Sequence, residues 1–151
     1  MDKAEPTFAL GEAQGLREGD RAAILAVGSM VQTADNAAKL LAEVGINCTV
    51  INCRFVKPLD HKTILYWARR VPHLITIEDN VLTGGFGSAV LELLAEAGIR
   101  KNKVSRLGYP DHFIESGTIP ELHALYGLNE ESIYRVVTGR PLTLAGVEVG
   151  K

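Results

Sequence analysis

Two neighbouring carboxylates and a glycine-rich turn are the features of this sequence whose residue types and spacing could support chemistry. Glu78 and Asp79 follow a short apolar run at residues 74–77, and three glycines lie within residues 84–87. Carboxylates can serve as general acids or bases, and the N–H groups of a glycine-rich turn before a helix can bind an anion. The turn matches neither G-x-x-x-x-G-K-[ST] nor G-x-G-x-x-G. We therefore favour a structural role for both features, and keep an anion site as the alternative.

The other reactive residue types show no pattern of a known site. The four histidines lack H-x-x-x-H spacing and the two cysteines lack C-x-x-C spacing, so we expect no metal site. Ser29 and Ser88 do not lie in a G-x-S-x-G nucleophile turn. Because no nucleophile–base pair is visible, the sequence predicts no catalytic residue and makes an independent small enzyme the least favoured interpretation.

Alternating apolar runs and amphipathic segments must position these residues. The run at 74–77 has the character of a buried strand, and Phe86 begins a helical pattern that Gly98 ends. The order of the segments predicts an α/β fold with three layers, α/β/α. Further strands are expected at residues 13–17, 21–27, 48–53 and 103–107, and further helices after Ser29, Lys57, Thr118 and Asn129.

Several details of these elements are also predicted. The helix after Ser29 should carry Val44 on its apolar stripe, and Pro58 should lie in the first turn of the next helix. Gly108 should break the last strand after residue 107. Thr118 and Glu121 have the spacing of a capping box, and the helix that follows should have Leu122, Leu125 and Tyr126 on its apolar side.

Length and composition indicate one ordinary globular domain. The 151 residues divide into a linker and edge strand at 1–20, an α/β domain at 21–139 and a tail at 140–151. A net charge of −2 argues against nucleic-acid or membrane partners, and the chain has no signal-peptide pattern. Cys48 and Cys53 lie five apart on one expected strand, so they should face opposite sides as buried thiols, which is typical of a cytoplasmic protein.

The crevice where neighbouring strand ends meet is the expected place for a ligand or a contact with another domain. In a doubly wound sheet this crevice lies where successive connections leave on opposite faces. Here it would lie between the strands that end at Val27 and Ile77. The residues expected to line this possible anion or interdomain site are Gly28, Ser29, Glu78, Gly84, Gly85 and Gly87.

Three segments carry a family resemblance. Residues 54–60, 78–92 and 109–128 together resemble the C-terminal domain of the 1-deoxy-D-xylulose-5-phosphate synthases, thiamine-diphosphate enzymes of the transketolase superfamily. The similarity extends from about Gly11 to Val137. One departure is Ser116, where many members have histidine or glutamine.

The resemblance implies a five-stranded, mostly parallel sheet whose first strand is an antiparallel edge strand. It also implies that the full-length enzyme is a transferase and a homodimer. Such an enzyme condenses pyruvate with glyceraldehyde 3-phosphate, with loss of CO2, for isoprenoid, thiamine and pyridoxal synthesis. Two preceding domains would hold thiamine diphosphate and magnesium, so this part alone is expected to be inactive and to bind no cofactor. The alternatives are a small-molecule anion-binding module and the C-terminal domain of a transketolase or of a 2-oxo-acid dehydrogenase β subunit.

Overall fold

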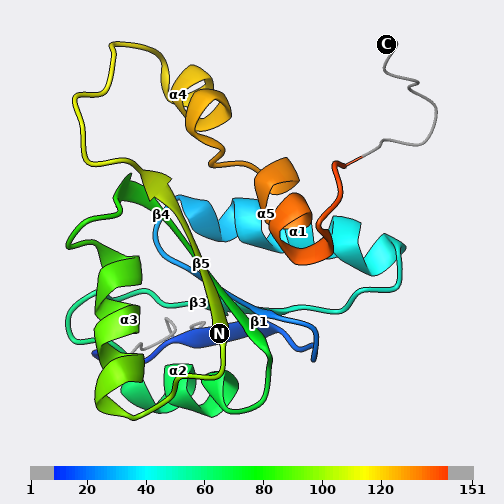
Figure 1. Cartoon of the computed structure of the whole chain (residues 1–151), viewed down its shortest axis with the longest axis vertical. Helices are drawn as coiled ribbons and strands as arrows, with labels where there is room; N and C mark the ends of the chain where they lie inside the picture. Colours follow the sequence, from blue (N-terminus) through cyan, green and yellow to red (C-terminus); the bar gives the residue numbers. More distant parts are fainter. Residues whose placement is uncertain (1–8, 143–151) are drawn as a thin grey trace, which may run out of the picture.

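A computed structural model describes residues 9–142 of the chain (Figure 1). Residues 1–8 and 143–151, which belong to the predicted linker and tail, lie outside the described part. The elements in chain order are β1 (Gln14–Arg17), β2 (Ala23–Ala26), α1 (Met30–Glu43), β3 (Thr49–Asn52), α2 (His61–Ala68), β4 (His73–Val81), α3 (Phe86–Glu96), β5 (Lys103–Tyr109), α4 (Ile119–Tyr126) and α5 (Glu130–Thr138).

The five strands form one sheet in the order β1-β3-β2-β4-β5. β1 pairs with β3 in antiparallel fashion, whereas β2 pairs in parallel with both β3 and β4, and β4 pairs in parallel with β5. Ala26 lies opposite Ile77, so β2 and β4 run side by side up to the expected crevice. The predicted five-stranded α/β sheet with an antiparallel edge strand is confirmed.

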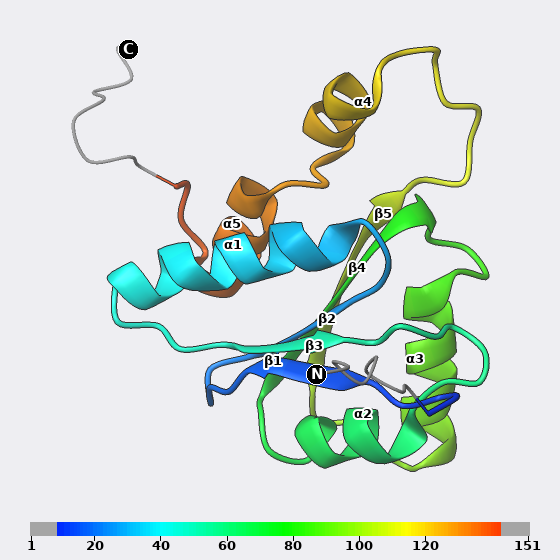
Figure 2. The same cartoon turned by 180° about the vertical axis from the view of Figure 1, so that it is seen from behind.

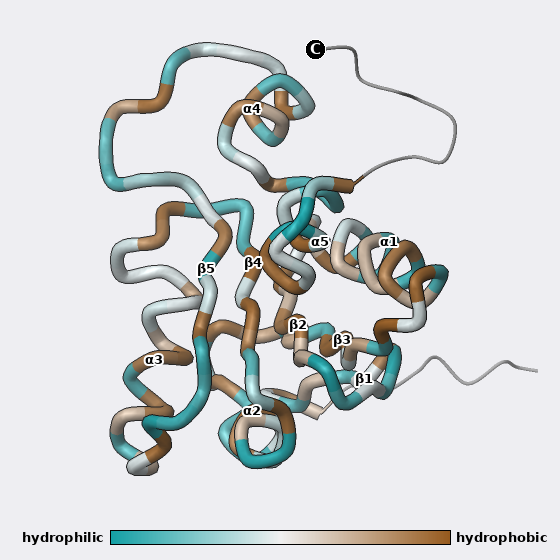
Figure 3. Tube along the Cα trace, turned by 45° about the vertical axis from the view of Figure 1, so that its right-hand side comes forward, coloured by the Kyte–Doolittle hydropathy of each residue, from teal (hydrophilic) through white to brown (hydrophobic). Residues whose placement is uncertain are grey.

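Helices cover both faces of the sheet (Figure 2). Side chains of β2 alternate between the faces, because Ile24 packs with α1 and α5 whereas Leu25 packs with α2 and α3. Cys48 and Cys53 belong to the two opposite cores, as predicted, and both are buried free thiols. Figure 3 shows the apolar residues concentrated in β2, β3 and β4 between the helices.

Local sequence signals define the ends of several helices. Asn129 accepts a hydrogen bond from the N–H of Ser132 at the start of α5, and Thr118 and Glu121 form the predicted capping box. Gly127 and Gly139 adopt the left-handed conformation where α4 and α5 end. These local predictions are confirmed.

Two strands are longer than predicted. β4 continues beyond Ile77 to Val81, and β5 continues through Gly108 to Tyr109. The register shifts after Ile77, and pairing resumes between Val81 and Tyr109. Gly108 supports this pairing, because a β-carbon there would lie 2.9 Å from the carbonyl oxygen of Asn80.

Three predictions about the helices were wrong. Val44 is 55% exposed, because α1 ends at Glu43 and Val44 is its C-cap. Pro58 precedes α2, whose N-cap is Asp60. Leu125 is 67% exposed, because α4 stands off the sheet and buries no residue. Among the described residues, no helix is long and apolar enough to cross a membrane.

Candidate functional site

Glu78 ties the end of the sheet to the start of α3. Its carboxylate accepts hydrogen bonds from the N–H groups of Phe86, at 2.7 Å, and Gly87, at 2.8 Å. The side chain is buried, with 1% of the residue exposed. The first N–H groups of a helix have no partner within the helix and favour negative charge. Here the chain itself supplies that charge, so Glu78 caps α3 from a neighbouring strand.

The glycines of the turn serve this contact in different ways. Gly85 has a φ of −83°, so a left-handed backbone is not what requires glycine at this position. A β-carbon at Gly85 would instead lie 2.3 Å from Oε2 of Glu78 and 2.3 Å from the carbonyl oxygen of Val81. The left-handed residue is Gly84, with a φ of +70° and open space around it. Gly87 faces Thr76 and Arg106, which would both meet a β-carbon there.

Hydrogen bonds from Ser88 and Arg106 also stabilise the glycine-rich turn. The hydroxyl of Ser88 donates to the carbonyl of Leu82 at 2.7 Å and accepts from the N–H of Gly84 at 3.1 Å. Nη1 of Arg106 donates to the same carbonyl, at 3.2 Å, and to the Ser88 hydroxyl, at 3.1 Å. Sequence reasoning missed the role of Arg106, because it lies on β5 and reaches the turn only in the folded sheet.

Asp79, on β4, contacts residues of three further elements at the same edge of the sheet: the start of α1, β5 and α4. The Ser29 hydroxyl donates to its carboxylate at 3.2 Å, and Nε2 of His123 on α4 lies 3.2 Å from Oδ1. Nε2 of His123 has no hydrogen-bond partner of normal geometry among the described residues, so this contact is a close approach and not a regular hydrogen bond. Tyr109 on β5 also hydrogen-bonds the carboxylate.

These contacts change two pKa values. Burial raises the pKa of Asp79, but the interactions with Tyr109, His123 and Ser29 outweigh burial and hold the pKa below its ordinary value. Burial, followed by the Asp79 carboxylate, raises the pKa of Tyr109 to about 12. The cluster is therefore a neutral phenol and an ionised carboxylate near neutral pH. No sequence signal pointed to this grouping, since Tyr109 and His123 lie far along the chain from Asp79.

A hollow of about 320 Å³ lies at this edge, between the ends of β2 and β4. It brings together Gly28, Ser29, Glu78, Gly84 and Gly85 of the predicted site, but Gly87 is not among the lining residues. Glu78 and Asp79 both line it, and within residues 9–142 no lysine, arginine or histidine does. An anion there would meet two carboxylates, and the N–H groups of Phe86 and Gly87 already bond Glu78. The geometry therefore favours a polar or cationic neighbour over an anion.

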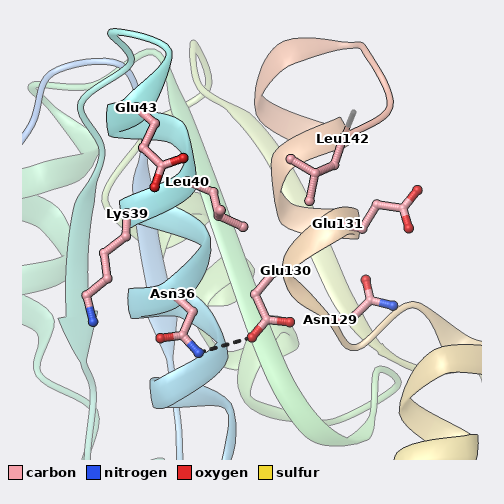
Figure 4. A pocket seen from close by; sticks show the side chains of 8 residues that line it. All are labelled: Asn36, Lys39, Leu40, Glu43, Asn129, Glu130, Glu131 and Leu142. Carbon is pink, nitrogen blue, oxygen red and sulfur yellow. Dashed lines mark hydrogen bonds between the residues drawn. The ribbon is translucent and has the colours of Figure 1, made fainter. Parts of the chain in front are cut away.

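A larger hollow of about 600 Å³ lies away from this edge, between α1 and α5 (Figure 4). Asn36 donates a hydrogen bond to Glu130 across it, at 3.2 Å. Glu43 and Glu131 add two more carboxylates to its lining, and Lys39 adds a cation. Across residues 9–142, no group of three histidine, cysteine, aspartate or glutamate side chains is placed to hold a metal ion.

Comparison with known proteins identifies the family. Residues 11–133 match the family described as "Transketolase, C-terminal domain". The chain is 49% identical to 1-deoxy-D-xylulose-5-phosphate synthase of Desulforudis audaxviator over 89% of its length and 21% of that protein. It is 50% identical to 1-deoxy-D-xylulose-5-phosphate synthase 1 of Geobacter metallireducens over 88% of its length and 21% of that protein. The chain thus spans about a fifth of the length of these curated relatives.

Solved structures agree with this assignment. A structure titled "Split gene transketolase, inactive beta4 tetramer" matches with a TM-score of 0.80 and 34% identity, over 87% of this chain and 43% of that one. Transketolase from Campylobacter jejuni matches with a TM-score of 0.61 and 20% identity, over 90% of this chain and 20% of that one, which shows the shared fold alone. The chain therefore belongs to the transketolase C-terminal domain family, and it is similar to the corresponding domain of 1-deoxy-D-xylulose-5-phosphate synthases at 49–50% identity.

Proposed function

We propose that this chain is the C-terminal structural domain of a 1-deoxy-D-xylulose-5-phosphate synthase, and that it packs on the preceding domains of that enzyme without contributing catalytic groups. The observation that carries the proposal is the identity of 49–50% over 88–89% of the chain, within relatives of which the chain spans 21%. The complete enzyme would condense pyruvate with glyceraldehyde 3-phosphate, release CO2 and supply isoprenoid synthesis. It would act as a cytoplasmic homodimer.

The geometry at the sheet edge supports a structural role. The carboxylate of Glu78 binds the N-terminus of α3, and the carboxylate of Asp79 contacts Ser29, Tyr109 and His123. Burial raises the pKa of Cys48 to about 11 and that of Cys53 to about 12, so neither thiol is activated as a nucleophile near neutral pH. The two carboxylates therefore stabilise the fold, and the two thiols are buried in its cores.

Thiamine diphosphate and Mg2+ are assigned to the preceding domains. The hollow at the sheet edge does not fit a diphosphate, because Glu78 and Asp79 present negative charge to it and no cationic side chain of the described part of the chain lines it. The same electrostatics disfavour the alternative of a small-molecule anion-binding module. The alternative of a transketolase domain has less support, at 34% identity against 49–50% for the synthases.

A chimera tests the proposal. This chain would replace the matched region of the Desulforudis audaxviator synthase, and formation of 1-deoxy-D-xylulose 5-phosphate would be measured with thiamine diphosphate and Mg2+. We expect activity comparable with that of the parent enzyme, because the domain would restore the native packing. A folded chimera that binds thiamine diphosphate but forms no product would contradict the proposal.

A further inference from the structure

We propose that residues 110–126, here called the projecting segment, are the surface through which this domain docks on the preceding domains, and that the partner surface is apolar with a basic rim. The inference rests on the proposed function and adds to it the location and chemistry of the contact. Figures 1 and 2 show the projecting segment extending beyond the end of the sheet as a loop followed by α4.

The projecting segment exposes large apolar side chains. Phe113 is 92% exposed, Leu125 is 67% exposed and Ile119 is 64% exposed. Isolated apolar residues are normal on protein surfaces, but α4 buries none of its own residues in the domain. A helix usually gains its stability by packing an apolar face, but only half-buried side chains such as Leu122 and Tyr126 pack α4 against this domain. A partner that covers the exposed apolar side chains would supply further packing.

The charge of the surrounding chain indicates what kind of partner fits. No lysine or arginine occurs from residue 107 to residue 134. Asp111, Glu115 and Glu121 are exposed carboxylates within the projecting segment. A basic rim around an apolar patch would complement this surface, because opposite charges favour the encounter and like charges oppose it. A second copy of the segment would bring the same carboxylates together, so we favour the preceding domains as the partner.

The projecting segment is already held in place for docking. It starts after Tyr109, at the end of β5, and it is followed by Leu128, which is buried in the core. Between these anchors, His123 contacts Asp79, and the ring of Tyr126 lies edge-on to the ring of Tyr109, with the two centroids 5.4 Å apart. Docking would therefore require little ordering of the segment, which lowers its entropic cost.

The segment also adjoins the hollow at the sheet edge. Asp79 lines that hollow and contacts His123 of the projecting segment, so the two surfaces are joined through one side chain. The hollow favours a polar or cationic neighbour, as the acidic segment does. One partner surface with basic groups around an apolar centre would therefore satisfy both.

Substitutions in the chimera test the docking surface. Phe113→Ser combined with Leu125→Ser removes two exposed apolar side chains, and Val44→Ser is the control at the C-cap of α1, because Val44 is 55% exposed. Glu115→Lys reverses a charge on the segment, and Glu96→Lys is its control on α3. Each variant would also be made in the isolated chain. Unchanged unfolding midpoints there would show that the fold is intact.

Differential scanning calorimetry of the chimera is the measurement. We expect the C-terminal domain of the unsubstituted chimera to unfold together with the other domains. With Phe113→Ser and Leu125→Ser, the unfolding transition of the C-terminal domain should separate from that of the other domains. Its midpoint should fall to the unfolding temperature of the isolated chain. Glu115→Lys should shift it in the same direction, by less at high salt. Val44→Ser and Glu96→Lys should leave the single transition unchanged.

The outcomes separate this inference from the proposed function. A chimera without synthase activity contradicts the proposed function. An active chimera in which the Phe113 and Leu125 variants behave like Val44→Ser overturns the docking surface alone. Sedimentation of the isolated chain tests whether a second copy of the chain binds the projecting segment. A tight dimer that Phe113→Ser abolishes would show that it does, which would also overturn the inference.

Discussion

The carboxylate of Glu78 occupies the space that a side chain at Gly85 would need. A β-carbon at Gly85 would lie 2.3 Å from Oε2 of Glu78, well inside van der Waals contact. The same oxygen accepts the N–H of Phe86 at 2.7 Å. Glycine at this position therefore allows the strand-borne carboxylate to reach the first turn of α3, and the two residues form one structural unit.

Replacing Glu78 should destabilise the domain strongly. Glu78→Ala leaves the N–H groups of Phe86 and Gly87 buried without an acceptor, at a cost of roughly 1–3 kcal/mol for each group. Glu78→Gln keeps one acceptor oxygen, so its cost should be smaller. Urea unfolding of both variants measures the difference, with the exposed Glu96→Gln as the control. Equal midpoints for Glu78→Ala and Glu96→Gln would contradict the capping role.

Both Gly84 and Gly85 should resist substitution, for different reasons. Gly85→Ala places a β-carbon against backbone and carboxylate, and overpacking of this kind costs about 1–3 kcal/mol. Gly84→Ala meets no neighbour but forces a left-handed φ, which costs about 1–2 kcal/mol.

Removal of the Glu78 side chain separates the effects of the two glycine substitutions on stability. In a Glu78→Ala background, Gly85→Ala should cost less, because part of the clash has gone, whereas the cost of Gly84→Ala should stay the same. A double-mutant cycle by urea unfolding measures this coupling. Additive effects for Gly85 and Glu78 would show that the clash is relieved elsewhere.

Asp79 should contribute stability that is lost in acid. Its pKa in the folded chain lies below its unfolded value of about 3.9, so its contribution is fully present above that value and is lost as the pH falls through the lower folded pKa. The side chain is 31% exposed, so solvent screening limits the effect to about 1 kcal/mol or less.

Unfolding of Asp79→Asn as a function of pH tests this expectation. The variant should be less stable than the parent near neutral pH, and the difference should shrink below about pH 4. Asp35 and Asp60 also have lowered pKa values, so some acid sensitivity should persist in the variant. A constant difference between the two proteins from pH 7 to pH 2 would contradict the role assigned to the ionised carboxylate.

The isolated chain should neither bind thiamine diphosphate with Mg2+ nor decarboxylate pyruvate. The described residues around the hollow at the sheet edge include two carboxylates and no cation, so a diphosphate would be repelled there. Calorimetric titration with the cofactor and Mg2+ measures binding directly, and the intact Desulforudis audaxviator synthase is the positive control. A dissociation constant in the micromolar range would contradict the assignment of the cofactor to other domains.

The amino-acid sequence determined the features that depend on near neighbours. Buried runs and helical spacing predicted the order of strands and helices, and five-residue spacing placed Cys48 and Cys53 on opposite faces. Asn129, Thr118 and the glycines after α4 and α5 act within one or two turns of chain. Such signals can be recognised in a sequence because the interacting groups lie only a few residues apart.

Tertiary structure decided which groups interact at the site. Whether Glu78 would be an acid, a ligand or a cap depended on the position of Phe86 and Gly87 across the turn. The pairing of Asp79 with Tyr109 and His123, and the extension of β4 and β5 past their predicted ends, required the parallel register of two strands that are distant in sequence. Residue types state which hydrogen bonds and charges are available, but only the packed sheet fixes which of them meet.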